Sequence, residues 1–182
     1  MTSAALPLRV AILGPASSGK TTLAAALAER YRTVWVPEYL REFVDVEGRV
    51  PVAGDQFNIA STQRRREDAA AQGAGTYLFC DTAPLMTAIY SRHYFGGIDD
   101  RLARLADGHQ RDYALTLVTA PDIPWVADGL QRECEQVSVA INRLLMEELA
   151  MRRIPYVLVS GDPEQRLAQV ERLLTTVTRR AD

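Results

Sequence analysis

Eight residues near the N-terminus constrain the fold of this chain more than any other segment. They read Gly14-Pro15-Ala16-Ser17-Ser18-Gly19-Lys20-Thr21, after the apolar run Leu8–Leu13 and before the Ala/Leu-rich segment Thr22–Tyr31. A glycine-rich turn between a strand and a helix lets the backbone wrap an anion, and the N–H groups at the helix start then point at it. The pattern G-x-x-x-x-G-K-[ST] in this setting predicts a phosphate-binding loop. In such a loop Lys20 contacts the β- and γ-phosphates and Thr21 ligates Mg²⁺.

Lys20 is the only lysine among the 21 lysine and arginine residues of the chain. An ammonium group is a compact point charge suited to a phosphate, whereas a guanidinium group is broad and planar. A chance glycine-rich turn would not account for a lysine at this one position, so we expect the loop to bind a nucleoside triphosphate. The expected nucleotide-binding residues are Gly14, Ser17, Ser18, Gly19, Lys20, Thr21 and Thr22.

Short apolar runs alternate with longer segments of helical pattern along the chain. Runs that are apolar on both faces are typical of a parallel sheet covered on each side. The expected strands are Leu8–Leu13, Thr33–Val36, Tyr77–Cys80, Leu115–Thr119 and Tyr156–Ser160. The expected helices are Thr22–Tyr31, Asp55–Gln72, Pro84–Tyr94, Arg101–Ala106, Glu135–Arg152 and Pro163–Val177. This alternation predicts an α/β three-layer, doubly wound sandwich with a five-stranded parallel sheet.

The length and composition fit one globular domain over residues 1–182. A formal net charge of −2 provides no positive field that would attract nucleic acid or anionic lipid. No apolar run reaches the ~18 residues that span a bilayer, and Met1–Pro7 lacks the pattern of a signal peptide. Cys80 and Cys134 are too few for a disulfide framework or a thiolate metal site. We expect a cytoplasmic protein without a nucleic-acid or membrane partner, of undetermined oligomeric state.

Asp81 directly follows the apolar run Tyr77–Cys80. The carboxyl ends of parallel strands face the ligand crevice in this fold class, so a carboxylate there can hold Mg²⁺ directly or through water. Asp81 is therefore an expected metal ligand together with Thr21, and an expected catalytic residue. A helix cap before Pro84 is the alternative role, and the two roles are compatible.

Glu38 follows the second expected strand, and Tyr39 and Arg41 come next. In small phosphate-loop kinases the acceptor lies over this region, so the Glu38 carboxylate is a candidate base for the attacking hydroxyl. Tyr39 and Arg41 are candidate substrate contacts, and Arg41 could pair with the transferred phosphate or with Glu38. The alternative is a solvated helix start with an ordinary Glu/Arg pair.

A lid-like loop is expected over about residues 121–132, after the fourth strand. Trp125 is a candidate to stack on a flat, cationic aromatic ring, or else an apolar anchor under the loop. Asp128 could bind ribose hydroxyls or form a turn with Gly129. Arg132 could neutralise charge on the transferring phosphoryl group. The expected catalytic residues are therefore Lys20, Glu38, Asp81 and Arg132.

We expect most of the remaining polar residues to have structural rather than catalytic roles. The run Arg64–Arg66 is expected on a solvated helix face, and neither His93 nor His109 is expected to be a catalyst. The segment Ser160–Pro163 either passes near the adenine or forms a plain turn with Asp162 as the cap of the last helix.

Several of these segments together resemble the ribosylnicotinamide kinase domain of NadR-type NAD-biosynthesis proteins. The segments are Gly14–Thr22, Val36–Tyr39 with Arg41, Asp81-Thr82 and Pro124–Leu130. Many families share the phosphate loop, whereas Pro-Trp-Val-Ala-Asp-Gly-Leu at Pro124–Leu130 and Glu-Tyr at 38–39 are more specific. The resemblance extends from about Val10 to Leu174, which is nearly the whole chain.

The resemblance implies a nucleoside-kinase-like fold and transfer of the γ-phosphate of Mg²⁺·ATP to the 5′-hydroxyl of nicotinamide riboside, which gives nicotinamide mononucleotide. The family pattern has arginine directly after Asp-Gly-Leu, where this chain has Gln131, and Arg132 comes one residue later. NadR-type proteins also carry an adenylyltransferase domain, some with a DNA-binding module. This chain has no room for either and lacks the paired-histidine signature, so neither NAD synthesis nor repression is expected.

Two alternatives stay open. A kinase of the same fold could act on another nucleoside or a vitamin alcohol, since this scaffold hosts many functions. A regulatory ATPase could instead act through a protein partner. The acceptor-side carboxylate at Glu38 favours a small-molecule kinase, because a plain ATPase needs no such group.

Overall fold

The computed structural model describes residues 6–126 and 134–178. At its centre lies a sheet of five parallel strands in the order β2-β3-β1-β4-β5. The strands are β1 (Leu8–Leu13), β2 (Trp35–Val36), β3 (Tyr77–Asp81), β4 (Leu115–Thr119) and β5 (Val157–Val159). The helices are α1 (Lys20–Arg30), α2 (Tyr39–Glu47), α3 (Gln56–Ala70), α4 (Pro84–Phe95), α5 (Asp100–Asp107), α6 (His109–Asp112), α7 (Glu135–Met151) and α8 (Pro163–Thr178), with a 3-10 turn at Ala53–Asp55. The predicted five-stranded parallel sheet is confirmed.

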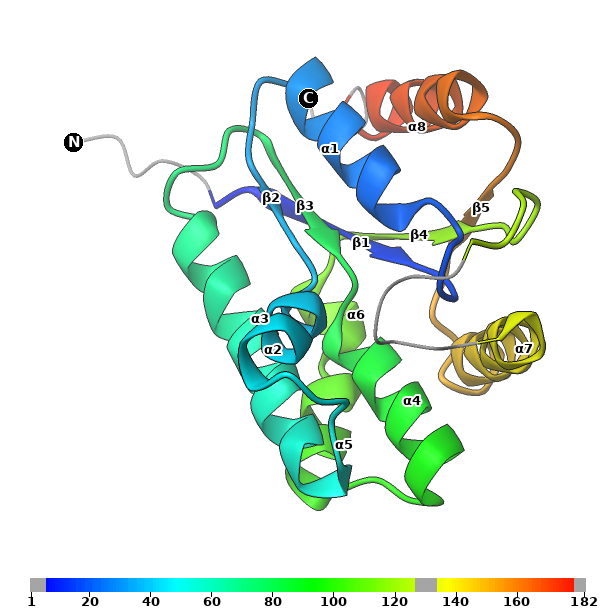
Figure 1. Cartoon of the computed structure of the whole chain (residues 1–182). Coiled ribbons are helices and arrows are strands. Elements are labelled where there is room, and N and C mark those ends of the chain that lie inside the picture. The colour runs from blue at the N-terminus through cyan, green and yellow to red at the C-terminus, as the bar shows by residue number, and fades with distance from the viewer. Residues whose placement is uncertain (1–5, 127–133, 179–182) are drawn as a thin grey trace.

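Helices cover both faces of the sheet and make three layers (Figure 1). Helices α1 and α8 lie on one face, and α3, α4 and α7 lie on the other. Alternate residues of β1 serve the two faces: Val10 and Ile12 pack in the cluster under α1 and α8, whereas Ala11 and Leu13 pack in the other cluster. Because successive side chains of a strand point to opposite faces, a strand buried on both sides is apolar throughout.

Strand β2 is shorter than the predicted run Thr33–Val36. The Thr33 backbone N–H donates to the Ala28 carbonyl at 2.9 Å and so closes the end of α1 instead of joining the sheet. Its hydroxyl donates to the Tyr77 carbonyl at 2.7 Å. The first residue of the run therefore caps the end of α1, and the strand begins at Trp35.

Helix α2 is absent from the predicted helices, although the sequence analysis allowed a helix start with a Glu/Arg pair at Glu38–Arg41 as an alternative. Only Phe43 and Val44 of its nine residues are buried, so its apolar pattern is too short to show a helical period. Gly48 ends it in the left-handed conformation with φ of 64°, and its N–H donates to the Val44 carbonyl at 2.9 Å. This helix lies directly after Glu38 and carries Arg41.

Strands β1, β3 and β4 end at one edge of the sheet. In their register Ile12 pairs with Asp81 and Leu13 pairs with Val118. The phosphate loop, Asp81 and the segment after β4 therefore emerge side by side, where open α/β sheets bind their ligands. No helix in the described part of the chain is long and apolar enough to cross a membrane.

Candidate active site

Hydroxyl groups hold the phosphate loop, residues 14–21, against the end of β4. Ser18 Oγ donates to the Pro15 carbonyl at 2.8 Å and lies 2.7 Å from Thr119 Oγ1. Thr119 Oγ1 also donates to the Leu13 carbonyl at 3.2 Å. Gly14 packs so closely here that a Cβ would lie 2.3 Å from Thr119 Oγ1. Thr119, which the sequence analysis did not single out, thus shapes the loop.

Helix α1 begins where the phosphate loop ends. Its N-cap, Gly19, has φ of 84°, a conformation that favours glycine. No side chain of the described residues caps this terminus, so the first N–H groups of α1 are available to an anion. Lys20 Nζ donates to the Pro15 carbonyl at 2.9 Å and so lies across the loop. Ser17 Oγ donates to the Val126 carbonyl, which ties the loop to the segment after β4.

Thr21 and Asp81 meet at the mouth of the loop. Thr21 Oγ1 donates to Asp81 Oδ2 at 2.6 Å. Asp81 is 1% exposed, and its Oδ1 has no hydrogen-bond partner within the described residues. A buried carboxylate oxygen without a partner requires an explanation, and a hydroxyl beside a carboxylate is a donor set that suits Mg²⁺. These two residues therefore fit the metal that the sequence analysis expects.

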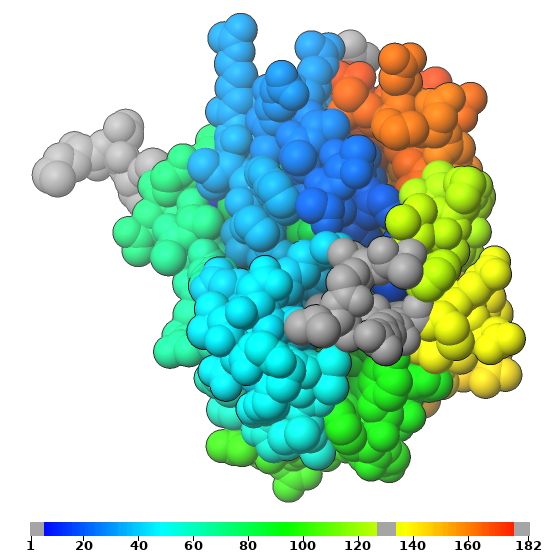
Figure 2. All heavy atoms as spheres, viewed as in Figure 1, coloured from blue at the N-terminus to red at the C-terminus, as the bar shows by residue number. Residues whose placement is uncertain are grey.

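Two hollows adjoin this pair on one face of the molecule. The first is called the donor hollow, because it contains the loop expected to bind the nucleotide, and is lined by Ser17–Thr22, Arg41, Ile123, Pro124 and Val126. The second is called the acceptor hollow, because it contains the expected base Glu38, and is lined by Glu38, Leu40, Gln56, Ile59, Gln63, Thr82, Met86, Thr87 and Tyr90. Figure 2 shows the start of α1 in blue, α2 in cyan and the segment after β4 in yellow-green around this face. Thr21 lines the donor hollow, and Asp81 directly precedes Thr82 of the acceptor hollow, so the Thr21–Asp81 hydrogen bond links the linings of the two hollows.

Glu38 and Arg41 stand at the start of α2 and face different hollows. Glu38 lines the acceptor hollow and Arg41 lines the donor hollow. Arg41 Nε lies 3.7 Å from Glu38 Oε2, and the Glu38 side chain is the less exposed of the two, at 15% against 47%. The Glu/Arg pair considered from sequence is therefore present, and it spans the boundary between the hollows.

The ring of Tyr39 packs between α2 and α3, against the buried residues Phe43, Val44 and Ile59. The Arg66 guanidinium lies 4.5 Å above the ring, and Phe43 meets it edge-on at 6.5 Å. Arg66 also donates to both carboxylate oxygens of Glu42, at 2.6 and 2.7 Å. The Tyr39 side chain is thus not among those that line either hollow, although its backbone N–H donates to Gln63 Oε1 at 2.8 Å.

The segment after β4 borders the donor hollow only in part. Ile123, Pro124 and Val126 line it. The Trp125 ring is half-buried, and its Nε1 is buried without a hydrogen-bond partner in the part of the chain that the structure describes. Asp128 and Arg132, expected to contact ribose and phosphate, lie outside the described residues.

Thr82, named from the sequence only within the segment Asp81-Thr82, had no expected role in the site. It is buried, lines the acceptor hollow and has φ of 81°, which is rare for a β-branched residue. Its N–H donates to the Ile12 carbonyl at 3.0 Å. Such strain costs about 1–3 kcal/mol and occurs where the surroundings impose it, often at functional sites. No pattern in a single sequence reveals a left-handed threonine.

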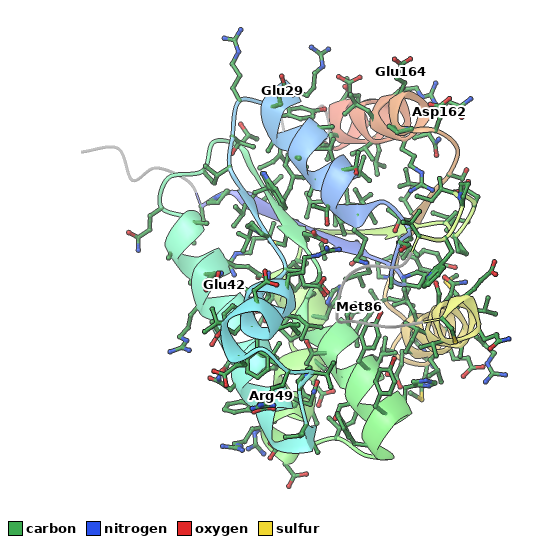
Figure 3. The ribbon with its side chains drawn as sticks, in the orientation of Figure 1. Glu29, Glu42, Arg49, Met86, Asp162 and Glu164 are labelled. Atoms are coloured by element: carbon green, nitrogen blue, oxygen red, sulfur yellow. The ribbon has the colours of Figure 1, made fainter. Side chains whose placement is uncertain are left out.

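Asp162 is the cap of the last helix, as the plain-turn interpretation predicts. Its Oδ1 accepts from the Gln165 N–H at 2.8 Å, and Gln165 Oε1 accepts from the Asp162 N–H at 3.0 Å. This reciprocal arrangement is a capping box. Figure 3 shows Asp162 at the start of α8. The turn that it caps brings Gly161 and Pro163 to a narrow hollow beside Gly19 and Ile123.

A buried polar cluster occupies the other end of the sheet. Glu67 is fully buried and accepts from the Tyr113 hydroxyl, and Arg9 Nη1 lies 3.8 Å from its carboxylate. Burial raises the pKa of Glu67 to about 7, against the opposing effects of Tyr113 and the arginines. Burial likewise lowers the pKa of His109 to about 4. These groups lie away from the phosphate loop, which agrees with the expectation that His109 is not a catalyst.

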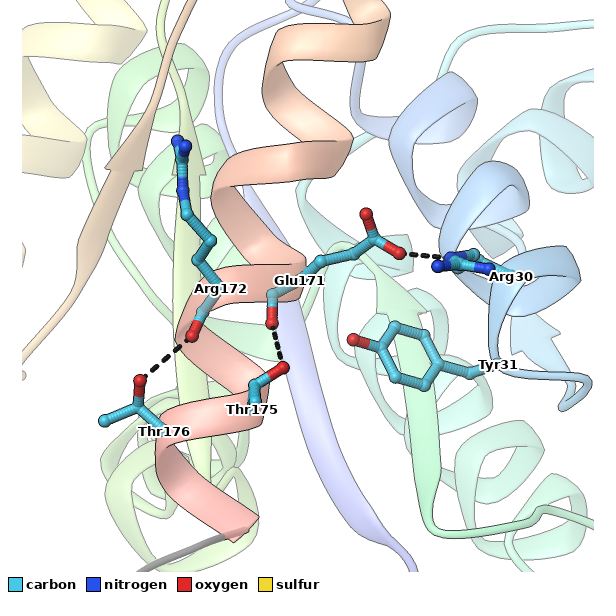
Figure 4. A pocket seen from close by; sticks show the side chains of 6 residues that line it. All are labelled: Arg30, Tyr31, Glu171, Arg172, Thr175 and Thr176. Atoms are coloured by element: carbon cyan, nitrogen blue, oxygen red, sulfur yellow. Dashed lines mark hydrogen bonds and ion pairs between the residues drawn. The ribbon is translucent and has the colours of Figure 1, made fainter.

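A further surface hollow lies between the C-terminal end of α1 and α8 (Figure 4). An ion pair between Arg30 and Glu171 crosses it. The Thr175 and Thr176 hydroxyls donate to backbone carbonyls of their own helix, at 2.8 and 3.0 Å. These side chains already have hydrogen-bond or ion-pair partners within the protein. The hollow therefore lies at the contact between two helices and contributes no residue to the candidate site.

Sequence comparison relates the chain to two sets of proteins. A family model described as "AAA domain" matches residues 9–166. Two curated proteins named "Trifunctional NAD biosynthesis/regulator protein NadR" are 32% identical over 157 residues (Salmonella typhimurium) and 33% identical over 158 residues (Escherichia coli). The matches cover 81% and 84% of this chain but 37% and 38% of the relatives. The chain therefore spans little more than a third of the length of these relatives.

Solved structures share the fold. A NadR protein in complex with NR has a TM-score of 0.72 at 22% identity, over 86% of this chain and 46% of that chain. Thymidylate kinase from Candida albicans has a TM-score of 0.66 at 14% identity, over 95% and 93% of the two chains. Deoxyadenosine kinase from M. mycoides has a TM-score of 0.65 at 13% identity, over 93% and 100%. The nucleoside-kinase-like fold that the resemblance implied is confirmed.

Proposed function

Because the chain belongs to the AAA domain family and is homologous to the NadR proteins, we propose that it is an ATP-dependent kinase of nicotinamide riboside. It transfers the γ-phosphate of ATP to the 5′-hydroxyl of the riboside and releases ADP and nicotinamide mononucleotide. The observation that carries the proposal is the Thr21–Asp81 hydrogen bond, which links the linings of the donor hollow and the acceptor hollow.

On the donor side, the phosphate loop supplies the anion site. The N–H groups at the start of α1 face the β- and γ-phosphates, and Lys20 exchanges its bond with the Pro15 carbonyl for the phosphate oxygens. Thr21 and Asp81 hold Mg²⁺, which when bound neutralises charge that develops on the phosphoryl oxygens. Arg132 assists at the same group.

On the acceptor side, Glu38 acts as the base or orienting group. Its carboxylate lines the acceptor hollow and lies next to Arg41, which faces the phosphates. As the hydroxyl oxygen bonds to the γ-phosphorus, its proton passes to Glu38 and the bond to the ADP oxygen breaks. Arg41 then contacts both the protonated carboxyl group of Glu38 and the transferred phosphate.

The assignment of nicotinamide riboside rests on the relatives and on the acceptor side of the chain. The curated relatives are named for NAD biosynthesis, and one NadR structure holds NR. The segment Pro124–Leu130, with Trp125 and Asp128, supports a flat cationic ring and a ribose as the ligand. Tyr39, named with Arg41 as a substrate contact, supports the start of α2 through its packing between α2 and α3.

Another nucleoside is the second candidate acceptor. Deoxyadenosine kinase and thymidylate kinase share this fold, and the acceptor hollow is lined by a tyrosine and two glutamines that suit many bases. A regulatory ATPase acting through a protein partner would need no acceptor carboxylate. Dependence of ATP turnover on an added small molecule separates these possibilities.

The test is release of ADP from Mg²⁺·ATP, with and without nicotinamide riboside, with the Lys20→Ala variant as the control. We expect a riboside-dependent rate that the variant lacks, and nicotinamide mononucleotide as the product. A rate that responds to another nucleoside but not to the riboside would overturn the acceptor assignment. A rate that responds to no small molecule would overturn the kinase proposal itself.

A further inference from the structure

One buried arginine joins three loops around the phosphate site. Arg166 lies in the first turns of α8, and its side chain is 3% exposed. Its guanidinium donates to the carbonyls of Ser18, Ala120 at 2.9 Å and Gly161 at 2.8 Å, and to the carboxylate of Asp122. The phosphate loop, the segment after β4 and the turn before α8 are thereby held by a single side chain.

The bond to Ser18 determines the direction of one peptide group in the phosphate loop. In a trans peptide the carbonyl and the following N–H point to opposite sides. Because the Ser18 carbonyl points at Arg166, the Gly19 N–H is directed away from Arg166. Gly19 is the N-cap of α1, so its N–H belongs to the anion-binding end of that helix.

The packing at Gly19 leaves little room for a side chain. A Cβ there would lie 3.0 Å from Arg166 Nη1 and 3.4 Å from Ile123 Cδ1. Gly19 also has φ of 84°, where glycine is favoured. The guanidinium therefore packs directly against the back of the loop.

Asp122 holds the guanidinium in place. Its Oδ2 accepts from the Gly161 N–H at 2.6 Å, and its Oδ1 accepts from Arg166. Burial opposes ionisation, but the Gly161 N–H and Arg166 together keep the pKa of Asp122 below its usual value. The apolar residues Val170 and Leu174 already attach α8 to the sheet. Attachment of the helix therefore does not by itself require a buried charge at Arg166.

We propose that Arg166 is a positioning residue for the donor nucleotide, which aims the Gly19 N–H at the phosphates through its bond to the Ser18 carbonyl. The proposal rests on nucleotide binding by the phosphate loop, which is part of the proposed function, but not on the identity of the acceptor. Loss of Arg166 weakens ADP binding by about tenfold or more, as expected when a charge-assisted bond to the loop is removed.

The experiment compares Arg166→Met and Arg166→Lys with a matched control, Arg172→Met. Arg172 lies on the same helix, is exposed and borders the hollow between α1 and α8. Binding of Mg²⁺·ADP is measured by calorimetry without any acceptor, and the Gly19 amide resonance is followed in ¹⁵N-labelled protein. Thermal melting shows whether each variant is folded.

We expect both Arg166 variants to bind ADP more weakly, and their Gly19 resonance to move less on binding than in the wild type. Arg172→Met should match the wild type in both respects. If Arg166→Met does not fold, Arg166→Lys keeps the charge but loses the fork of donors and carries the test. Wild-type ADP affinity in a folded Arg166 variant, or weaker affinity with an unchanged Gly19 shift, would overturn the proposal. Wild-type protein that binds ADP but does not phosphorylate the riboside would refute only the acceptor.

Discussion

The Thr21 hydroxyl donates a 2.6 Å hydrogen bond to the Asp81 carboxylate, although the two residues are 60 positions apart in the chain. Parallel pairing of β1 with β3 brings them together, because Ile12 and Asp81 are partners in the sheet. The other Asp81 oxygen is buried and lacks a hydrogen-bond partner among the residues described. We therefore propose this pair as the point at which donor and acceptor chemistry meet.

Asp81→Asn should lower turnover by about two powers of ten or more, because an amide replaces the carboxylate that holds the metal. The Mg²⁺ concentration needed for half-maximal ADP release should rise at the same time. Asp45→Asn on the exposed side of α2 is the control and should leave both quantities unchanged. Unaltered magnesium dependence in Asp81→Asn would show that Asp81 is not a ligand.

Glu38→Gln should reduce kcat by about two to four powers of ten while magnesium dependence stays as in the wild type. The amide keeps the size of the side chain but cannot accept the proton of the acceptor hydroxyl. Glu42→Gln, on the same helix and paired with Arg66, is the matched control. Near-normal turnover by Glu38→Gln would exclude Glu38 as the base.

Gly14→Ala should abolish nucleotide binding and destabilise the fold by roughly 3 kcal/mol, since strain and overpacking combine there. The added methyl would lie 2.3 Å from Thr119 Oγ1 and 2.7 Å from Ser18 Oγ. Gly48→Ala also places alanine at positive φ, but a Cβ there meets nothing within 4 Å. It should cost only about 1–2 kcal/mol and leave ADP binding intact. Chemical denaturation and calorimetry measure the two effects, and equal costs would contradict the packing argument.

Glu67 should make the protein less stable as the pH rises from about 4.5 to about 7. Burial raises the pKa of Glu67 to about 7, so the folded state holds this proton more tightly than the unfolded state. Over that range the protein should lose about 3 kcal/mol relative to Glu67→Gln. Glu29→Gln, exposed on α1 (Figure 3), is the control. Parallel stability curves for Glu67→Gln and the wild type would contradict the assignment.

His109 should have the opposite effect on the stability of the folded protein as the pH rises. Burial lowers the pKa of His109 to about 4, so the folded state binds this proton less tightly than the unfolded state. The contribution of His109 to the free energy of unfolding is therefore complete above about pH 6.5 and is lost as the pH falls toward 4. Between about pH 4.5 and 6.5 the two groups offset each other. As the pH rises through this range, Glu67→Gln, which keeps only the His109 effect, should gain stability more steeply than the wild type. His109→Gln, which keeps only the Glu67 effect, should lose stability. A His109→Gln curve that matches the wild type would show that the ring is not buried in its neutral form.

The local patterns were sufficient to predict the sheet, to identify the phosphate-loop sequence, and to single out Thr21 and Asp81, which the structure brings into contact. Runs that are apolar on both faces identify buried parallel strands, and the glycines with Lys20 and Thr21 depend only on neighbours in sequence. Asp81 could be assigned because the end of a strand is a position that sequence reveals. Helix α2 could not, since Phe43 and Val44 are its only buried residues.

Only the tertiary structure revealed the roles of residues that depend on partners far away in the sequence. Nothing in the sequence separates Arg166 from the other arginines, because its burial arises when α8 packs beside the phosphate loop and β4 ends next to both. Thr82 and Thr119 likewise acquire their roles from strand order. The sequence alone determined which chemical groups the site can use, because the motif residues are set by short-range spacing. The tertiary structure decided which other side chains position those groups, because that depends on long-range packing.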